Sequence, residues 1–194
     1  MLNQPELIAQ LQQGNEQAFT KLVDDWQDMV YNTALGIVQN EEDADDITQE
    51  VFIQAYQSIS SFKGDSKIST WLYRITVSKA LDHEKRKKRK KRFGFVQSLL
   101  GSGDEEHIHP VLFNHPGVEL EKKEKARELF NALKRIPEKQ RIAFTLHKLE
   151  GLSYQEVAEI MNTTLYAVES LIGRAKANLK KELIKYYGTL KDPK

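Results

Sequence analysis

Apolar residues recur along this chain at spacings of three and four, which is typical of amphipathic α-helices. The clearest run begins after Asn15 and ends near Val38, and its apolar positions are Phe19, Leu22, Val23, Trp26, Val30, Ala34 and Ile37. A second run keeps the same period from Ala44 to Ile59. No stretch shows the strict alternation of a half-buried strand. The pattern therefore predicts an all-α protein.

Helix-capping residues and glycines indicate where these helices begin and end. Pro5 suits the first turn of a short first helix that ends at Gly14. Asn15 and Asn40 are placed to cap the second and third helices, and acidic residues fill the first turn after Asn40, where the helix dipole favours them. A loop around Gly64 then separates a fourth helix from the third. This fourth helix begins at Ser69 or Thr70 and continues into a run of basic residues.

Helical periodicity is lost between residues 93 and 117, where stretches such as GSGDEEHIHP are typical of a linker. It resumes in the last third of the chain, interrupted at Pro137 and at Gly151. We therefore expect two small helical domains, residues 1–92 and 118–194, joined by a flexible linker at 93–117. The second domain ends in a pair of helices with a short turn between them.

That pair, LSYQEVAEIMNTTLYAVESLIGRAKANL, has the layout of a helix-turn-helix. Ser153 and Glu156 form the S-x-x-E capping box, the turn falls at Asn162-Thr163, and Thr164 can cap the second helix. In a helix-turn-helix, the N-terminal half of the second helix reaches base edges in the major groove. The predicted inner face of that helix is Leu165, Val168, Leu171, Ile172, Ala175 and Leu179. An ordinary helical hairpin is the alternative interpretation.

Charge is strongly segregated, although the formal net charge is only +1. Residues 1–60 carry 11 acidic side chains and one lysine, whereas residues 61–92 carry 12 basic and three acidic side chains. The block KRKKRKKR, Lys85 to Arg92, contributes eight of those basic residues in succession. Such asymmetry favours one cationic and one anionic partner, with solvated helix faces as the alternative.

A tryptophan shares the polar face of the basic helix. On a helical wheel Trp71 falls beside Arg74, Ser78, Asp82, Lys85 and Arg89. An aromatic ring next to a row of cations suits single-stranded or melted DNA, because stacking contributes ~1–3 kcal/mol per base. The other interpretation is a half-buried tryptophan packed under the loop 61–67.

The acidic helix carries two further stripes beside its core stripe. One contains Asp45, Gln49, Phe52 and Tyr56, and the other contains Asp46, Glu50 and Ile53. Acids, an amide and outward aromatics together suit a basic protein surface. Phe52 and Tyr56 fit the hydrophobic core equally well.

Several classes of protein are disfavoured. The chain has no cysteine, which excludes disulfides and cysteine zinc sites and fits a reducing compartment. It shows neither a signal peptide nor an apolar run of roughly 20 residues that would span a bilayer. The best candidates for a metal-dependent enzyme are linker residues without helix-fixed spacing: Glu105, Glu106, His107, His109 and His115. We expect no catalytic residue, no metal site and no cofactor.

An acidic helix, a tryptophan-bearing basic helix and a helix-turn-helix, in this order, resemble the extracytoplasmic-function (ECF) group of bacterial sigma-70 factors. The resemblance rests on DADDITQEVFIQAY, STWLYRITVSKALDHEKRKKR and the helix-turn-helix segment, and it covers most of residues 15–92 and 119–183. It implies a cytoplasmic, non-enzymatic transcription initiation factor. Its partners would be core RNA polymerase, through the clamp helices and the flap, and promoter DNA. Family members are often held inactive by an anti-sigma factor, which the linker would accommodate.

The resemblance also implies roles for individual residues. Those that would contact the polymerase clamp are Asp43, Asp45, Asp46, Gln49, Glu50, Phe52 and Ile53. Those that would capture and hold the minus-ten element are Phe62, Lys63, Gly64, Ser66, Lys67, Trp71, Arg74, Ser78, Lys79, Lys85, Arg86 and Arg89. Those that would read the minus-thirty-five element are Ser153, Tyr154, Thr163, Thr164, Leu165, Tyr166, Glu169, Ser170, Arg174 and Lys176.

The chain departs from the family pattern at three positions. Ser78 stands where members usually have Asn, and Glu169 and Leu171 stand where many have Lys and Arg. Fewer cations are therefore expected at the minus-thirty-five element. A stand-alone helix-turn-helix regulator, which binds DNA without polymerase, is the alternative function, and it leaves the acidic helix unexplained.

Overall fold

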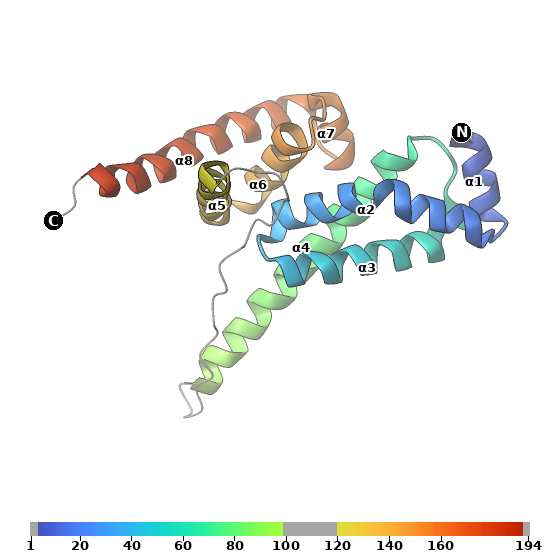
Figure 1. Cartoon of the computed structure of the whole chain (residues 1–194), viewed down its shortest axis with the longest axis horizontal. Coiled ribbons are helices and arrows are strands. Elements are labelled where there is room, and N and C mark those ends of the chain that lie inside the picture. Colours follow the sequence, from blue (N-terminus) through green and yellow to red (C-terminus); the bar gives the residue numbers. More distant parts are fainter. Residues whose placement is uncertain (1–3, 99–119, 192–194) are drawn as a thin grey trace.

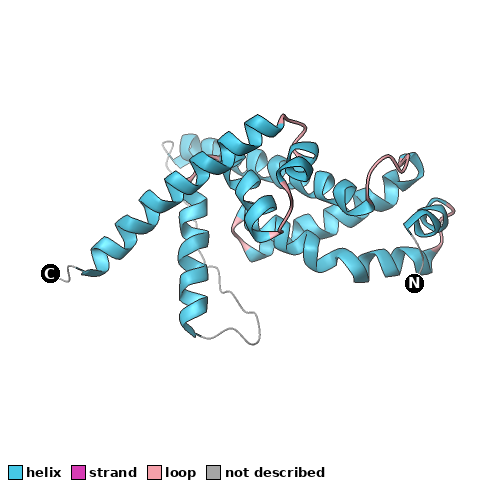
Figure 2. Ribbon diagram, turned by 90° about the horizontal axis from the view of Figure 1, so that it is seen from above, coloured by secondary structure: helices cyan, strands magenta, loops and turns pink. Residues whose placement is uncertain are grey.

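The computed structural model describes residues 4–98 and 120–191, with side chains placed for 4–90 and 127–185. Within these ranges every regular element is a helix, and short loops join the helices (Figure 2). The all-α prediction is confirmed.

The first domain contains four α-helices and one short 3-10 turn (Figure 1). They are α1 (Gln4–Gln12), α2 (Glu16–Val38), α3 (Glu41–Ser58), the 3-10 turn η1 (Ile59–Ser61) and α4 (Ile68–Ser98). Helices α2, α3 and α4 pack against one another, and α1 lies against α2 and η1. Each of the three long helices has fully buried residues in its apolar stripe, as Leu22, Ile47 and Leu72 illustrate.

The predicted caps form in the structure. The side chain of Asn15 accepts a hydrogen bond from the backbone N–H of Ala18 (3.0 Å), and that of Asn40 accepts one from Asp43 (2.8 Å). Each bond satisfies one of the backbone donors that a helix N-terminus leaves unpaired. The boundaries of α2 and α3 are therefore fixed by local chemistry that is visible in the sequence.

Helix α4 continues to Ser98 instead of ending at the predicted domain boundary at residue 92. Lysine and arginine are good helix formers, and one interior glycine, Gly94, costs only about 1 kcal/mol relative to alanine. The helix therefore runs through it. The predicted linker residues 99–117, including the histidine and glutamate candidates for a metal site, lie outside the described residues.

The second domain consists of α5 (Leu120–Arg135), α6 (Glu138–Phe144), the π-helical segment η2 (Thr145–Leu149), α7 (Tyr154–Ile160) and α8 (Leu165–Lys191). Pro137 and Gly151 mark breaks as predicted, and Gly151 has a left-handed φ of 73°. Helices α5, α6 and α7 all pack against the long α8.

The two domains pack directly on each other, which the sequence did not predict. Helix α2 contacts α6 and η2, and α4 contacts α7 (Figure 1). Buried apolar side chains from both domains form one continuous cluster that includes Val30, Leu72, Leu146 and Val157. A smaller cluster belongs to the second domain alone. The domains are thus distinct in sequence but share a core.

Candidate functional site

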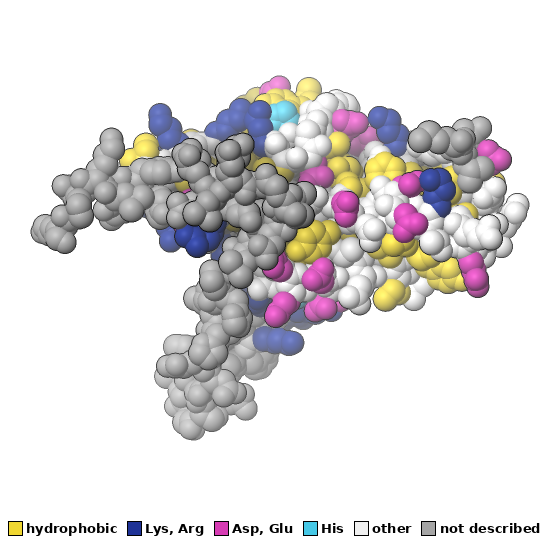
Figure 3. Space-filling model, viewed as in Figure 1, with side chains coloured by type: hydrophobic (Ala, Val, Ile, Leu, Met, Phe, Trp, Pro, Cys, Tyr) yellow, Lys and Arg dark blue, Asp and Glu magenta, His cyan; other side chains and the backbone are white. Residues whose placement is uncertain are grey.

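An exposed stripe of acidic, amide and apolar side chains runs along α3. Asp45, Asp46 and Gln49 are exposed, and they are followed along the helix by Ile53 and Tyr56, which are 57% and 56% exposed. Acidic side chains are scattered among hydrophobic ones over the face that carries α2 and α3 (Figure 3). Two large apolar side chains at this exposure on one helix make this face a candidate contact surface for a partner. These five residues are called the α3 stripe below.

Phe52 does not belong to this surface, contrary to the predicted clamp contact. It is only 8% exposed. Its helical neighbours at three and seven positions further on are Ala55 and Ile59, which are core residues. The Phe52 side chain therefore packs into the core between α3 and the rest of the domain. Tyr56, named in the sequence stripe but not among the predicted clamp residues, is the exposed aromatic instead, with its ring against Phe19 at 5.1 Å.

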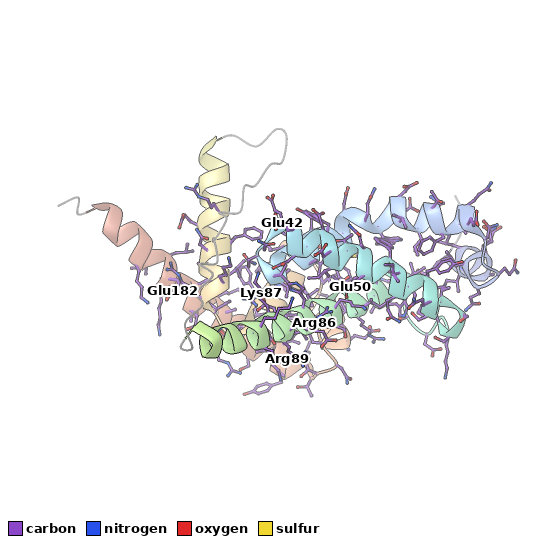
Figure 4. All side chains as sticks on the ribbon, turned by 90° about the horizontal axis from the view of Figure 1, so that it is seen from below. Glu42, Glu50, Arg86, Lys87, Arg89 and Glu182 are labelled. Atoms are coloured by element: carbon purple, nitrogen blue, oxygen red, sulfur yellow. The ribbon has the colours of Figure 1, made fainter. Side chains whose placement is uncertain are left out.

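Asp43 and Glu50 also point away from the α3 stripe. Asp43 pairs with His83 (3.3 Å) and Lys87 (2.9 Å), both on α4. Glu50 of α3 lies 3.4 Å from Arg86 of α4, and Figure 4 shows these two side chains next to each other. Part of the segregated charge is thus neutralised within the first domain.

The loop before α4 is braced from two sides. Phe62 is buried, and its ring contacts that of half-buried Trp71 with centroids 4.9 Å apart. The predicted packing of Trp71 against this loop is therefore present, whereas Phe62 is not free to meet a base. On the other side Gln12 donates from Nε2 to the carbonyl oxygen of Phe62 (2.8 Å) and to that of Ile59 (3.3 Å).

Sequence reasoning missed Gln12, because α1 had no assigned role. The remaining predicted residues of this surface are mostly accessible to solvent. The exposed ones are Lys63, Gly64, Lys67, Arg74, Ser78, Lys85, Arg86 and Arg89, and the half-buried ones are Ser66 and Lys79. They lie on the loop and along α4, where Lys79 and Arg86 pair with Glu50 of α3 and Arg74 pairs with α7.

The helix-turn-helix forms as predicted. Ser153 and Glu156 make both bonds of the capping box, Asn162 takes a left-handed φ of 48° in the turn, and Thr164 accepts from the backbone N–H of Ala167 (3.2 Å). Hydrogen bonds from the Ser153 backbone and hydroxyl hold the pKa of Glu156 below its usual range. The Glu156 side chain at the start of α7 therefore remains a carboxylate at neutral pH.

Most of the predicted reading residues are exposed at the start of α8. Tyr166 is 81% exposed, and Thr163, Thr164, Glu169 and Lys176 are also exposed. Ser153 and Arg174 are exposed too, whereas Tyr154 and Ser170 are half-buried. The Arg174 guanidinium folds back and donates to the Ser170 hydroxyl at 2.8 Å.

The assignment of Leu165 to the inner face of this helix is wrong, because Leu165 is 44% exposed. It is the first residue of α8, next to the turn, so the helix crossing begins to cover side chains only at Val168. This position leaves Leu165 on the predicted reading surface.

Two cations of the predicted minus-ten surface contact acidic side chains of α7 in the second domain. Arg74 on α4 forms an ion pair with Glu159 on α7 (3.0 Å), and Lys67 lies 3.5 Å from Glu156. Deeper in the interface the Tyr73 hydroxyl donates to Glu150 (3.2 Å). No sequence pattern indicated these contacts, since they join residues far apart in the chain.

Burial at this interface raises the pKa values of one carboxyl group and one phenol. Burial raises the pKa of Glu150, and hydrogen bonds from Tyr73 and Thr33 offset part of that rise. Burial also raises the pKa of Tyr73, and the nearby carboxylate of Glu150 raises it further. Tyr73 therefore remains neutral and acts as a hydrogen-bond donor.

Comparison with known proteins finds a matching family profile for each half of the chain. The family profile of Sigma-70 region 2 matches residues 22–90, and that of Sigma-70, region 4 matches residues 126–179. The ECF RNA polymerase sigma-E factor of Haemophilus influenzae is 34% identical over 182 residues, which cover 94% of this chain and 96% of the relative. The chain belongs to the sigma-70 family, in its extracytoplasmic-function group.

Other relatives agree with this assignment to the ECF sigma factors. RNA polymerase sigma-H factor of Pseudomonas aeruginosa is 31% identical, with 92% of both chains covered. The structure of CnrH in complex with the cytosolic domain of CnrY superposes with a TM-score of 0.66 at 25% identity, covering 91% of this chain and 94% of CnrH. RpoE of Bartonella quintana, solved with the anti-sigma factor NepR, has a TM-score of 0.61 at 23% identity, covering 85% and 96%, and shares the fold.

As a sigma factor the protein directs promoter recognition in transcription initiation, within a family that is not enzymatic. Among the residues that the structure describes, no group of histidine and acidic side chains could hold a metal ion. Within the same residues, none of the helices has the length and apolar character of a membrane span.

Proposed function

We propose that this sigma factor docks on the clamp helices of core RNA polymerase through the α3 stripe. The proposal is supported by one observation: exposed Ile53 and Tyr56 share one helix face with Asp45, Asp46 and Gln49. The apolar side chains supply affinity when they are buried. The acidic side chains favour a basic groove and repel other acidic surfaces, which gives specificity.

The second element of the proposal is promoter opening by the loop 62–67 and the polar face of α4. Separating and unstacking bases costs a few kcal/mol per step. Capture of the unstacked strand offsets that cost, with cations such as Arg74, Lys85 and Arg89 along its phosphates and Trp71 beside the captured bases. Phe62 acts here by supporting Trp71, since its own ring is buried.

The third element is recognition of the minus-thirty-five region by the turn and the start of α8. Exposed Thr163, Thr164 and Tyr166 lie where a helix-turn-helix presents residues to base edges. Lys176 lies further along the helix, where a phosphate contact adds affinity without sequence information. Attachment of both domains to polymerase supplies a high effective concentration, so neither surface needs high affinity alone.

An anti-sigma factor is a further partner in this proposal. The support is that the RpoE relative was solved with the anti-sigma factor NepR. Purification of the tagged protein from its native host, with mass spectrometry of what elutes, tests this. Elution of the sigma factor without a stoichiometric protein other than polymerase subunits would remove this partner from the proposal.

A pull-down of core RNA polymerase tests the α3 stripe. We expect a variant carrying Asp46→Lys, Gln49→Ala and Ile53→Ala to lose more than about 30-fold in affinity, because central contacts are worth ~2 kcal/mol or more each. Phe52 is left intact, since truncating a buried phenylalanine would unfold the domain. The matched control is Gln13→Ala with Glu16→Lys, which makes a similar charge reversal at the α1–α2 turn. Equal binding by all three proteins would refute the docking surface.

The salt dependence of holoenzyme binding tests the α4 surface. Arg74→Ala is expected to lower the slope of log affinity against log salt by about 1, because one phosphate contact is lost. An unchanged slope on promoter DNA would remove Arg74 from the DNA surface. The stand-alone regulator alternative predicts instead that the free protein binds duplex DNA tightly, and no observation favours it.

A further inference from the structure

The first turns of α8 carry an exposed face next to the turn that follows α7 (Figure 1). Its residues follow one another at spacings of three and four, and they are Tyr166, Glu169, Gly173 and Lys176. The opposite face of the helix packs into the second domain through Val168, Ile172 and Ala175. The four exposed residues are called the outer face of α8 below.

Gly173 lies on the outer face although nothing inside the described protein requires a glycine there. It is in the interior of α8, where glycine weakens a helix relative to alanine. Its φ is not left-handed, and a Cβ atom at this position would meet no atom of the described residues within 4 Å. Gly36 differs, because the Thr145 side chain fills the space beside it. The missing side chain at Gly173 therefore suits a partner that approaches the backbone of α8 closely.

The charges around Gly173 favour DNA as that partner. Lys176 on the outer face and Lys180, one turn further along, are exposed where the phosphates of a bound duplex would pass the helix. The Arg174 side chain lies along the helix instead, because its guanidinium donates to the Ser170 hydroxyl (2.8 Å) and to the Ser170 carbonyl oxygen (3.2 Å). The bases next to the first turns of α8 would therefore be met by few cations.

Glu169 is the acidic side chain of the outer face, one helical turn before Gly173. It is exposed, and its carboxylate has no hydrogen-bond or ion-pair partner among the described residues. Phosphates repel a carboxylate, so it needs a hydrogen-bond donor on a base to be stable in the major groove. The cytosine N4 amine is such a donor, whereas the adenine amine lies beside the N7 acceptor, which repels a carboxylate.

We propose that Glu169 selects a cytosine in the minus-thirty-five element by accepting a hydrogen bond from its N4 amine, and that Gly173 lets α8 lie deep enough in the major groove for this contact. Residues four apart on a helix lie one above the other, so a side chain at position 173 would meet the DNA beside Glu169. The proposal rests on the proposed function, in which the start of α8 meets the minus-thirty-five region, and it adds the base that this face discriminates.

Selection from a random duplex library by the reconstituted holoenzyme tests the base preference. The wild type is expected to enrich an upstream element in which one position prefers cytosine at least about fivefold over the other bases. Glu169→Ala should lose the preference at that position alone. Glu169→Gln should change it towards adenine, because an amide can bond both N6 and N7.

A matched control separates base recognition from net charge. Glu182→Gln removes one negative charge from the far part of the same helix, where Glu182 pairs with Arg135 (3.4 Å) and Lys185 (2.8 Å). Exposed pairs of this kind contribute little to stability. The holoenzyme with Glu182→Gln is therefore expected to enrich the same upstream element as the wild type.

Substitutions at Gly173 test the close approach to DNA. On a site that the wild-type holoenzyme enriches, Gly173→Ala is expected to lower affinity about 3-fold and Gly173→Leu more than about 10-fold, because the added atoms displace the helix from the groove. Neither variant should melt below the wild type, since alanine and leucine form helices better than glycine. Affinity for core polymerase without DNA should not change.

The outcomes separate this inference from the proposed function. If the wild type and both Glu169 variants enrich the same upstream element, cytosine selection is overturned and the role of α8 in DNA recognition stands. If Gly173→Leu binds the site as tightly as the wild type, or loses affinity for core polymerase without DNA, the close approach to DNA is overturned. If the wild type enriches no upstream element, the proposed recognition of the minus-thirty-five region fails, and this inference fails with it.

Discussion

At the scale of single residues, glycine at position 36 determines how closely the two domains approach. It lies inside α2, where glycine costs about 1 kcal/mol relative to alanine. Its close neighbour is the Thr145 side chain of the second domain. A helix-weakening residue in an otherwise apolar run is a recognisable signal for close packing, although the sequence does not say with which partner.

We predict that Gly36→Ala separates the domains without unfolding them. The added methyl group forces Thr145 away from α2, while the helix itself gains propensity. Small-angle scattering should show a larger radius of gyration for the free protein, and circular dichroism should show unchanged helix content. Gly173→Ala is the control, because a Cβ there meets no atom within 4 Å. An unchanged radius in the first variant would contradict the prediction.

A second prediction concerns Gln12, which links α1 to the loop before α4. Its amide donates to the Phe62 and Ile59 carbonyl oxygens, so Gln12→Ala should loosen the loop without touching DNA. Losing a hydrogen bond of about 1 kcal/mol predicts roughly fivefold slower promoter opening. Permanganate footprinting of melted thymines measures this, with Gln13→Ala as the control. If Gln12 only stabilises the fold, the melting temperature falls but the opening rate, measured well below it, does not.

The protein is called closed here when its two domains are in contact, as they are in the structure, and burial of Glu150 makes this closed state sensitive to pH. Its pKa is raised above the ordinary 4.5 in the closed protein by burial, so the closed state binds more protons than an open state in which the carboxyl is solvated. Closure is therefore favoured as the pH falls from neutrality towards 4.5, and this gain is absent at high pH. Tyr73 and Thr33 donate to the Glu150 carboxyl group from the first domain, and Glu156 acts on Tyr73.

The Glu150→Gln variant should remove this dependence, because the amide is neutral throughout and its oxygen still accepts from Tyr73. The melting temperatures of wild type and variant, measured between pH 5 and pH 8, give the test. The variant should be the more stable at pH 8, and the difference should shrink towards pH 5. A difference that is constant across this range would show that the carboxyl does not titrate with closure.

At the scale of secondary-structure elements, helix α3 combines two roles on one short segment. Its first turn holds Glu41, Glu42 and Asp43 beneath the Asn40 cap, where acids interact favourably with the helix dipole. Its middle carries the α3 stripe on one side and core residues such as Val51 on the other. Both faces require α3 to begin at the correct residue, because a change in its first residue would change the direction of every side chain that follows.

Asn40→Ala is expected to lower the free energy of unfolding by about 1 kcal/mol, since the backbone N–H of Asp43 loses its partner. Chemical denaturation monitored by circular dichroism measures the change. Affinity for core polymerase should fall only slightly, because the α3 stripe begins beyond the first turn. Gln57→Ala, an exposed substitution near the end of the same helix, is the control and should stay within ~0.5 kcal/mol of wild type. Equal stability of both variants and wild type would show that the cap contributes nothing.

At the scale of the whole molecule, two DNA-binding domains share one hydrophobic core while carrying acids and cations that neutralise each other. Separation of the domains would expose apolar side chains as well as charges, so a partner that separates them has to compensate for both. The stability of short elements at the contact, such as η2 and the seven-residue α6, depends most on the packing of the two domains. Helices of this length are marginal without tertiary packing.

Amide hydrogen exchange should report this change over the whole chain. On assembly with core polymerase and promoter DNA we expect slower exchange in α3, where the partner docks, and faster exchange in η2, which loses its packing on α2. Mass spectrometry of peptic peptides resolves the two regions. Slower exchange in both would mean that the domains remain in contact inside the complex.

Much of the fold is recoverable from the sequence because its determinants are local. Helical periodicity, the asparagine caps, the capping box at Ser153 and the breaks at Pro137 and Gly151 all involve residues within a few positions of one another. Charge segregation and the ordered motifs also indicated the family, which the two matched regions then established.

Side-chain direction at the edge of a stripe was harder to predict. Phe52 was expected either at the clamp surface or in the core, and Phe62 was expected at the promoter surface; both are buried. Leu165 was expected on the inner face of its helix and is exposed. The side chain of an aromatic residue at the border of an apolar stripe can point either into the core or towards solvent. Which way it turns depends on the neighbouring helix, and periodicity contains no information about that neighbour.

The sequence by itself determined the helices, their caps, the two domains and the family. These depend on contacts within a few residues, or on motifs that occur whole in the chain. Only the tertiary structure decided that Asp43 and Glu50 face α4, and that Arg74 meets Glu159 and Gly36 meets Thr145. Those pairs join residues tens of positions apart. Their physical cause is the burial of apolar surface between domains, which sets the geometry before any pair of charges can meet.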